Sequence, residues 1–178
     1  MSRTEVTTAL SKLLVSDTLY RSYWANEVTF DAGSPTECRV DFVAFRPENH
    51  SVSGIERGVF TAYEVKSCVA DFHSPNGHNF FCDRNYYVMP MEVYKKVVTE
   101  INLHKTGVYC PIPRGNKVLE EFENPTPFTG ENLNRWSMKC VAKQATAYAH
   151  QCRKRPLQEM LFMMLRSGRD YSFGGEDQ

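Results

Sequence analysis

The chain has 178 residues, which is long enough for one domain with a buried core and too short for two ordinary domains. Hydrophobic residues make up 42% of it and charged residues 24%, a balance that argues against a wholly disordered chain. Basic and acidic residues number 21 each, so the net charge does not indicate a nucleic-acid partner, and such a partner has to be argued from a local site.

Two features of the sequence bear on where the protein works. The longest apolar run, residues 160–165, is far shorter than the roughly 20 residues of a membrane-spanning helix. The first residues lack the basic and apolar regions of a signal peptide, so we expect a cytoplasmic protein without a membrane partner. The six cysteines are spread along the chain with no C-x-x-C pair, which indicates reduced thiols in that compartment.

The N-terminal half predicts a helix followed by three strands. Val6, Leu10, Leu13 and Leu14 form an apolar stripe at helical spacing. Residues 27–30, 38–45 and 59–65 are rich in β-forming side chains. Residues 31–35 have turn chemistry, and the polar stretch from 46 to 58 reads as a loop, so the strands should follow one another as a meander.

The second half predicts further helices around the same sheet. Ser67 is a candidate cap for a short helix that residues 74–77 interrupt, and residues 85–89 form a fourth strand. Pro90 begins a helix over 91–101, while 107–110 and 117–122 suggest a hairpin across the turn 111–115. After a linker at 124–130, helical patterns cover 131–151 and 157–167, with Pro156 in the first turn of the second. We therefore expect an α/β fold with a mixed central sheet, divided into a core at 1–123, a helical C-terminal extension at 131–167 packed on it, and a disordered tail at 168–178.

One aspartate and one glutamate stand inside apolar strands. Asp41 lies between Val40 and Phe42, and a carboxylate buried there is unfavourable unless a cation or hydrogen bonds compensate it. Glu64 and Lys66 alternate along the third strand and so share a face of the sheet. If the two strands are neighbours, Asp41 lies across from Glu64. Two carboxylates can hold Mg²⁺, and a lysine beside them can orient a water or offset charge on a phosphate, so the pattern predicts phosphodiester hydrolysis.

These residues also carry a family resemblance. Asp41 followed by Glu64-Val65-Lys66 resembles the D…(D/E)xK signature of the PD-(D/E)xK nucleases. The predicted order of elements resembles their αβββαβ, restriction-endonuclease-like core. Within that superfamily the chain is most similar to the MmcB-like DNA-repair family, through the blocks 39–41, 63–67, 70–72 and 82–90. The similarity spans about residues 27–100.

The resemblance implies a Mg²⁺- or Mn²⁺-dependent nuclease that hydrolyses DNA in repair or recombination, with residues 1–123 as its nuclease-like core. Asp41 and Glu64 would be metal ligands together with the main-chain carbonyl of Val65, and Lys66 would be the catalytic lysine. Glu27 matches the additional acidic residue of some members. The chain departs from the name-giving pattern because Val40, in place of proline, precedes Asp41.

Further basic residues are candidate contacts to DNA. Arg84 could reach a phosphate, and Lys139 and Lys143 are four residues apart on one face of the helix predicted for 131–151. The basic run 153–155 could track the DNA backbone. Asp71 and Asp83 could belong to the site or could fix local backbone, and for Asp83 the backbone role, at the turn into the fourth strand, is favoured. The small size and neutral charge suggest a homo-oligomer or a repair-protein partner.

Two other functions remain open at this point. One is a non-enzymatic DNA-binding accessory domain that keeps the nuclease fold. The other is a zinc-stabilised interaction protein, because Cys68, His73, His78 and Cys82 have metal-capable side chains, although their spacing matches no common zinc module. The sequence does not distinguish DNA from RNA, the shape of the substrate, or cleavage at ends from internal cleavage.

Overall fold

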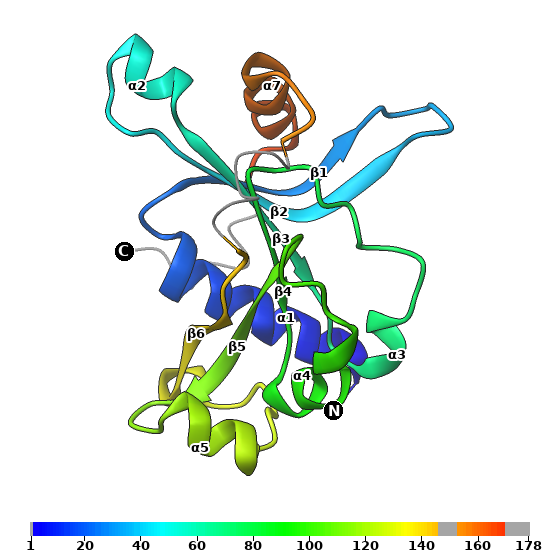
Figure 1. Ribbon diagram of the computed structural model, residues 1–178, viewed down its shortest axis with the longest axis vertical. Coiled ribbons are helices and arrows are strands. Elements are labelled where there is room, and N and C mark those ends of the chain that lie inside the picture. The colour runs from blue at the N-terminus through cyan, green and yellow to red at the C-terminus, as the bar shows by residue number, and fades with distance from the viewer. Residues whose placement is uncertain (1, 146–152, 170–178) are drawn as a thin grey trace.

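The computed structural model describes residues 2–145 and 153–169, and its centre is one six-stranded mixed sheet (Figure 1). The strands lie side by side in chain order: β1 Tyr23–Phe30, β2 Cys38–Arg46, β3 Val59–Val65, β4 Arg84–Val88, β5 Gly107–Pro113 and β6 Trp136–Ala142. β1 to β3 form an antiparallel meander, β4 and β5 continue parallel to β3, and β6 is antiparallel to β5. The predicted α/β class, mixed sheet and three-strand meander are confirmed.

The register between β2 and β3 decides where the candidate carboxylates lie. Phe42 is paired with Tyr63 at the last position of the ladder. One residue further on, Asp41 on β2 is opposite Glu64 on β3, as the sequence suggested. Beyond that position the two strands separate, because the outer part of β2 continues to pair only with β1 at Val28 and Phe30.

Helix α1 (Arg3–Leu14) covers one face of the sheet, where the apolar stripe predicted from the sequence is buried. Ser2 caps it: the Ser2 hydroxyl accepts the Glu5 N–H, and the Glu5 carboxylate accepts the Ser2 N–H. Leu10, Leu13 and Leu14 pack with strand residues in one apolar cluster. The helix continues as a π-helical turn, Val15–Leu19, before the chain enters β1.

Short helices join the strands. α2 (Val52–Glu56) was not predicted; the Ser51 hydroxyl caps it by accepting the Gly54 N–H. α3 (Val69–Phe72) begins after Cys68, so Ser67 is not its cap. α4 (Met91–Val97) and the 3₁₀ turn Val98–Glu100 confirm the helix predicted for 91–101.

The hairpin predicted for 107–122 is wrong. β5 runs through the expected turn to Pro113, and residues Val118–Glu123 form helix α5. β4 pairs with β5 only as far as Tyr109, so the missing N–H of Pro111 removes no bond from that ladder. In α5, the Glu120 carboxylate accepts the Lys117 N–H at the start of the helix. The sequence prediction gave more weight to the β-forming residues of this segment than to this local contact.

The helix predicted for 131–151 is also wrong over its first part. A 3₁₀ turn, Leu133–Arg135, leads into β6, and Trp136, Met138 and Cys140 pack on one face of the sheet with a period of two. Residues 136–142 therefore belong to the sheet and are not part of a helical extension. Residues 146–152, and the predicted tail from residue 170 onward, lie outside the described residues.

Helix α7 (Leu157–Ser167) confirms the last predicted helix, with Pro156 immediately before it as the N-cap. It lies on the face of the sheet opposite α1, over β1 and β2 (Figure 1). Met160 and Met164 pack there against strand residues such as Phe30 and Phe60. Among the described residues, no helix is long and apolar enough to cross a membrane.

Candidate active site

The candidate site lies at the fork where β2 separates from β3. Within the outer hairpin, Glu27 on β1 stands opposite Asp41, between the pairs Asn26–Phe42 and Val28–Val40, and has a positive φ of 52°. This break changes the alternation of side chains: Ala25 and Val28, three residues apart, pack in the same apolar cluster. Asp41 therefore lies at an irregular position of the β1–β2 ladder, where its carboxylate can turn toward β3.

Asp41 makes a specific contact with the neighbouring strand. Its Oδ2 accepts the main-chain N–H of Val65 at 2.7 Å. Burial raises the pKa of Asp41 to about 6; the Val65 N–H acts against this rise, and the nearby charge of Glu27 adds to it. The aspartate is thus held in place between β2 and β3, in a setting where burial makes its charge less favourable than in water and a bound cation would compensate that charge.

Glu64 is the most deeply buried acidic group of the site. Its side chain is 1% exposed, and within residues 2–145 and 153–169 its Oε1 has no hydrogen-bond partner. Burial first, and then the charge of Asp41, raise the pKa of Glu64 to about 9. Burying a carboxylate oxygen without a hydrogen-bond donor, beside a second carboxylate, costs free energy of folding. A divalent cation bound by both carboxylates would remove this penalty, so the residues fit the metal that the sequence predicts.

The other ligands for such a metal would be few. No group of three or more histidine, cysteine, aspartate or glutamate side chains in the part of the chain that the structure describes is arranged to hold a metal ion. Asp41 and Glu64 would therefore need main-chain oxygen and water to complete a coordination shell, which is usual for Mg²⁺. The carbonyl of Val65, which lies between Glu64 and Lys66 in the chain, stays a prediction in this role.

Lys66 is buried at the end of β3 and held by main-chain carbonyls. Its Nζ donates to the carbonyl of Asn76 at 2.6 Å and to that of Asp71 at 3.3 Å, and its side chain is 3% exposed. Among the described residues it makes no ion pair of 4.0 Å or less; its charge nevertheless lowers the pKa values of Asp41 and Glu64. An ammonium group has three protons, so two carbonyl contacts leave one N–H for another acceptor.

The loop after α3 packs directly against this lysine and glutamate. Gly77 has a φ of +72°, and a Cβ at this position would lie 2.7 Å from Lys66 Nζ and 3.0 Å from Glu64 Oε2. Only a glycine therefore lets the loop approach both groups without displacing them. Sequence reasoning took Ser74–Gly77 as a helix interruption and missed this role, because the contact joins segments that are not neighbours in the chain.

Asp71 fixes the start of the same loop. Its Oδ2 accepts the N–H of Ser67 at 2.9 Å and the Ser67 hydroxyl at 3.2 Å, which is the backbone-capping role, one of the two that the sequence left open for it. Its other oxygen pairs with Arg3 of α1. Asp71 thus joins the first helix to the segment that follows Lys66.

A pocket of about 430 Å³ opens between α1 and the fork. Asp41 and Glu27 line it on the strand side, and Glu27 is paired with Arg39 at 2.7 Å. The helix side is formed by a polar stripe of α1: Thr4, Thr7, Thr8 and Ser11. This stripe repeats at i, i+3, i+4 and i+7 and could have been recognised in the sequence, opposite the apolar stripe of the same helix.

Several predicted contacts lie away from the fork. Arg84 is at the start of β4 and shares a face with Tyr86, which packs in the α1-side cluster, whereas Glu64 alternates to the other face. Lys139 is exposed on β6, three strands from β3, and Lys143 follows the end of that strand. The prediction that both lysines share a helical face is therefore wrong.

The other metal-capable and basic residues have structural partners. His73 is bonded to Glu100 at 2.9 Å, and His78 to the Tyr87 hydroxyl at 2.6 Å, so these histidines do not gather around a zinc site with Cys68 and Cys82. Asp83 accepts the Phe60 N–H and pairs with Arg153 at 3.4 Å, in agreement with its predicted role in fixing backbone. Arg155 is bound by Asp31 and Glu159, both at 2.5 Å. Arg153 and Arg155 therefore anchor the chain before α7.

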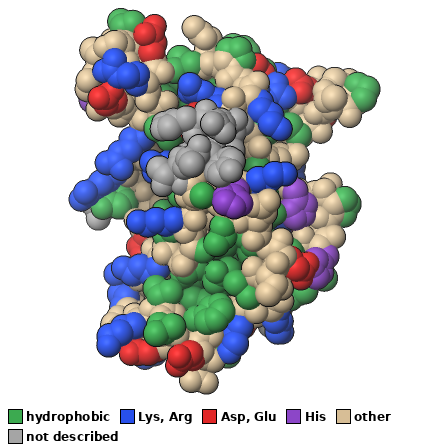
Figure 2. Space-filling model, viewed as in Figure 1, with side chains coloured by type: hydrophobic (Ala, Val, Ile, Leu, Met, Phe, Trp, Pro, Cys, Tyr) green, Lys and Arg blue, Asp and Glu red, His purple; other side chains and the backbone are tan. Residues whose placement is uncertain are grey.

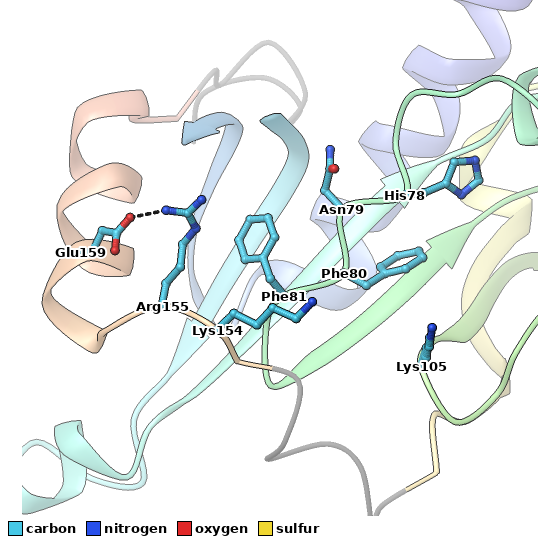
Figure 3. Close-up of a pocket in the computed structure, with 8 residues that line it drawn as sticks. All are labelled: His78, Asn79, Phe80, Phe81, Lys105, Lys154, Arg155 and Glu159. Atoms are coloured by element: carbon cyan, nitrogen blue, oxygen red, sulfur yellow. Dashed lines mark hydrogen bonds and ion pairs between the residues drawn. The ribbon is translucent and has the colours of Figure 1, made fainter. Parts of the chain in front are cut away.

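A pocket with two unpaired lysines lies on the α7 side of the sheet (Figure 3). The segment from His78 to Phe81 forms its floor, and Lys105 and Lys154 approach from its two sides. In the described parts of the chain, neither lysine side chain has a salt bridge or hydrogen bond. The pocket adjoins the fork, since His78 is bonded to Tyr87, which pairs with Glu64 in the sheet.

Comparisons with known proteins add no assignment: no protein-family model matches the chain, and neither the curated proteins nor the solved structures contain a significant match.

Proposed function

We propose that this protein is a metal-dependent nuclease with a PD-(D/E)xK-type core, similar to the MmcB-like DNA-repair family, that hydrolyses DNA phosphodiester bonds. The observation that carries the proposal is the unsatisfied, buried Oε1 of Glu64 beside Asp41, with Lys66 on the same strand. The order of α1, the β1–β3 meander and the following helices and β4 supports the αβββαβ comparison.

In this proposal each residue of the fork has one role. Asp41 and Glu64, with the Val65 carbonyl, would hold Mg²⁺ or Mn²⁺, which when bound supplies charge for the phosphate and lowers the pKa of a bound water. Lys66 would direct the N–H that its two carbonyl contacts leave free to the attacking water or to a phosphate oxygen. Glu27, across from Asp41 and paired with Arg39, would be the additional acidic residue at the edge of the site.

Contacts to DNA would come from local basic groups, because the net charge of the chain is zero. Figure 2 shows lysine and arginine side chains at several places on the face in view, among apolar and acidic ones. Lys105 and Lys154 line the pocket that adjoins the fork, and they are candidates for contacts to the DNA backbone. Lys139 and Lys143 could contribute only to a longer track, and a homo-oligomer or a repair-protein partner would extend the surface further.

The test is a cleavage assay with plasmid, linear, single-stranded and branched DNA in Mg²⁺ or Mn²⁺. We expect wild-type protein to cut at least one substrate and Lys66→Ala to be slower by about 10² to 10⁴, the range for loss of a group that acts in the transition state. Lys96→Ala, an exposed lysine on α4, is the control and should keep full activity. Equal cleavage by wild type and Lys66→Ala, or cleavage that survives EDTA, would contradict the proposal.

A second candidate is a DNA-binding accessory domain without catalysis. The observation that favours it is the full burial of Lys66 under two carbonyls, which could hold the lysine for structural reasons alone. It predicts no cleavage of any substrate, together with DNA binding that Lys66→Ala leaves intact and that a Lys105→Ala, Lys154→Ala double variant weakens. Binding measured by fluorescence anisotropy separates the two candidates.

A further inference from the structure

A second large pocket, of about 680 Å³, lies on the α1 side of the sheet where that helix has already ended. Three tyrosines on adjacent strands line it: Tyr63 on β3, Tyr86 on β4 and Tyr109 on β5. Their rings contact one another, with centroids of Tyr63 and Tyr86 stacked at 5.8 Å and those of Tyr86 and Tyr109 edge to face at 4.9 Å. Thr18 and Ser22, after the helix, complete one wall. The pocket thus has a rigid aromatic base and a polar rim.

Two arginines at the rim are without partners. Arg46 at the end of β2 and Arg84 at the start of β4 are exposed, and neither side chain makes a salt bridge or a hydrogen bond within the described part of the chain. Thr61 of β3 is paired with Ala44 on one side and with Arg84 on the other. Arg46 is two residues beyond Ala44 and therefore points to the same face as Arg84. Arg46 is paired with Val59 and Arg84 with Thr61, so the two side chains leave the same face of the sheet from the two strands that flank β3.

The remaining charges of the pocket are already compensated. Arg57 pairs with Glu48, and Asp17 pairs with Arg114 and accepts the Met138 N–H at 3.0 Å. The pocket therefore carries two uncompensated positive charges from Arg46 and Arg84. Guanidinium groups bind phosphate and carboxylate oxygens through two parallel hydrogen bonds, and a phosphate, which can carry two negative charges, matches the charge of both arginines.

The size and lining of the pocket indicate what carries that phosphate. A volume of about 680 Å³ is within the usual range for small-molecule sites and exceeds what a phosphate ion alone would fill. Tyrosine rings and hydroxyls offer contacts to a base and a sugar. We propose that this pocket binds a nucleoside monophosphate group, with the phosphate between Arg46 and Arg84 and the nucleoside toward the tyrosines. Its source is either a free nucleotide or the phosphorylated end of a single-stranded nucleic acid.

This pocket is separate from the fork. Thr61 precedes Glu64 by three residues on β3, about 10 Å along an extended strand. The Glu64 side chain also leaves the opposite face of the sheet from Tyr63. Binding here needs neither Asp41 nor Lys66 and does not depend on the nuclease proposal.

The experiment is calorimetric titration of the full chain, in EDTA, with adenosine 5′-monophosphate, adenosine and inorganic phosphate as probes. We expect the monophosphate to bind and adenosine not to bind, and each of Arg46→Gln and Arg84→Gln to raise the Kd by about tenfold or more. Arg135→Gln, an exposed arginine outside this pocket, should leave the Kd unchanged. Thermal unfolding of every variant checks that these surface changes leave the fold intact.

The source of the phosphate is decided by competition with short single-stranded DNA, with and without a 5′-phosphate. Displacement of the nucleotide by the phosphorylated strand alone, at lower concentration than the nucleotide requires, identifies a nucleic-acid end. Failure of both strands to compete, with the nucleotide still bound, identifies a free nucleotide. Binding that is insensitive to both arginine substitutions, or no binding of the monophosphate up to about 1 mM, overturns the proposal.

Discussion

Glu64 is a residue whose environment works against the stability of the metal-free protein. Its carboxylate is buried, lacks a partner for Oε1 in the described structure, and faces the charge of Asp41. Most buried polar groups in native proteins are hydrogen-bonded, so an exception of this kind points to a ligand or to chemistry. A stability measurement can therefore test the site without any nucleic-acid substrate.

We predict that Glu64→Gln makes the protein more stable in EDTA at alkaline pH. The pKa of Glu64 is raised from 4.5 to about 9, so the folded protein keeps a proton that the unfolded chain loses. The unfolded state binds fewer protons across this window, so the stability contributed by Glu64 falls as the pH rises from about 5 to 9. At pH 8 the glutamine variant should be more stable by about 1 to 3 kcal/mol in urea unfolding, and at pH 5 the difference should disappear.

Mg²⁺ should reverse the order, because the ion stabilises only a protein that binds it. Addition of Mg²⁺ should raise the unfolding midpoint of the wild type and leave that of Glu64→Gln unchanged. Glu121→Gln is the matched control: this carboxylate accepts hydrogen bonds from Asn116 and Thr126, which lower its pKa, so the amide should destabilise the protein. A Glu64→Gln variant that is less stable than wild type at both pH values would contradict the account of the site.

At the scale of elements, the loop between α3 and β4 determines the position of Lys66. We predict that Gly33→Ala loses about 1 kcal/mol of stability, because alanine adopts its positive φ with strain, and that Gly77→Ala loses more, because neighbouring atoms must also shift. Only Gly77→Ala places a Cβ against Lys66 Nζ and Glu64 Oε2, since the space around Gly33 is open. Gly77→Ala should therefore lose most DNA cleavage and Mg²⁺ binding, and Gly33→Ala should keep both.

This pair of variants separates a site effect from a backbone effect. Urea unfolding and the cleavage assay are run on both proteins and on wild type. Equal activity in the two variants would mean that the approach of Gly77 to Lys66 and Glu64 has no functional role.

The elements also show which parts of the fold the sequence could predict. The strands around Asp41 and Glu64 were recognised because their apolar residues and turns are local signals, and β3 has the predicted bounds. Trp136, Met138 and Cys140 repeat every second residue, as expected for a strand. β6 was nevertheless missed, because the same segment also contains good helix-forming residues. The predicted strand in β5 ended before Pro111, because proline is disfavoured in strands. β5 tolerates this proline because its ladder with β4 ends at Tyr109.

For the candidate site, alternation along β3 was enough to place Glu64 and Lys66 together, and the meander brought Asp41 opposite them. The groups that hold Lys66 could not be predicted, since they are carbonyls of Asp71 and Asn76 in an irregular loop, and any residue type supplies a carbonyl. The separation of Lys139 from the fork follows from β6 being at the edge of the sheet, a consequence of strand order that one sequence does not encode locally.

At the scale of the whole molecule, α7 is the element whose attachment is least expected from chain order. It follows β6 by way of residues 146–152, outside the described structure, yet it packs against β1 and β2 at the other edge of the sheet. Arg155 anchors its start by binding Asp31 and Glu159 and by lying over the rings of Phe30 and Phe81. Helix α7 therefore packs on the β1–β2 hairpin, which carries Glu27 and Asp41.

We predict that Met160→Ala lowers the free energy of unfolding by about 2 to 4 kcal/mol, because it empties a fully buried position between α7 and the strands. Phe162→Ala on the same helix is the control; its side chain is 61% exposed, so the loss should be small. If α7 is part of one cooperative unit, Met160→Ala shifts a single urea transition measured both by tryptophan fluorescence and by circular dichroism. Two separate transitions, with only the first moved by Met160→Ala, would mean instead that α7 detaches on its own and that the β1–β2 hairpin keeps Asp41 in place without it.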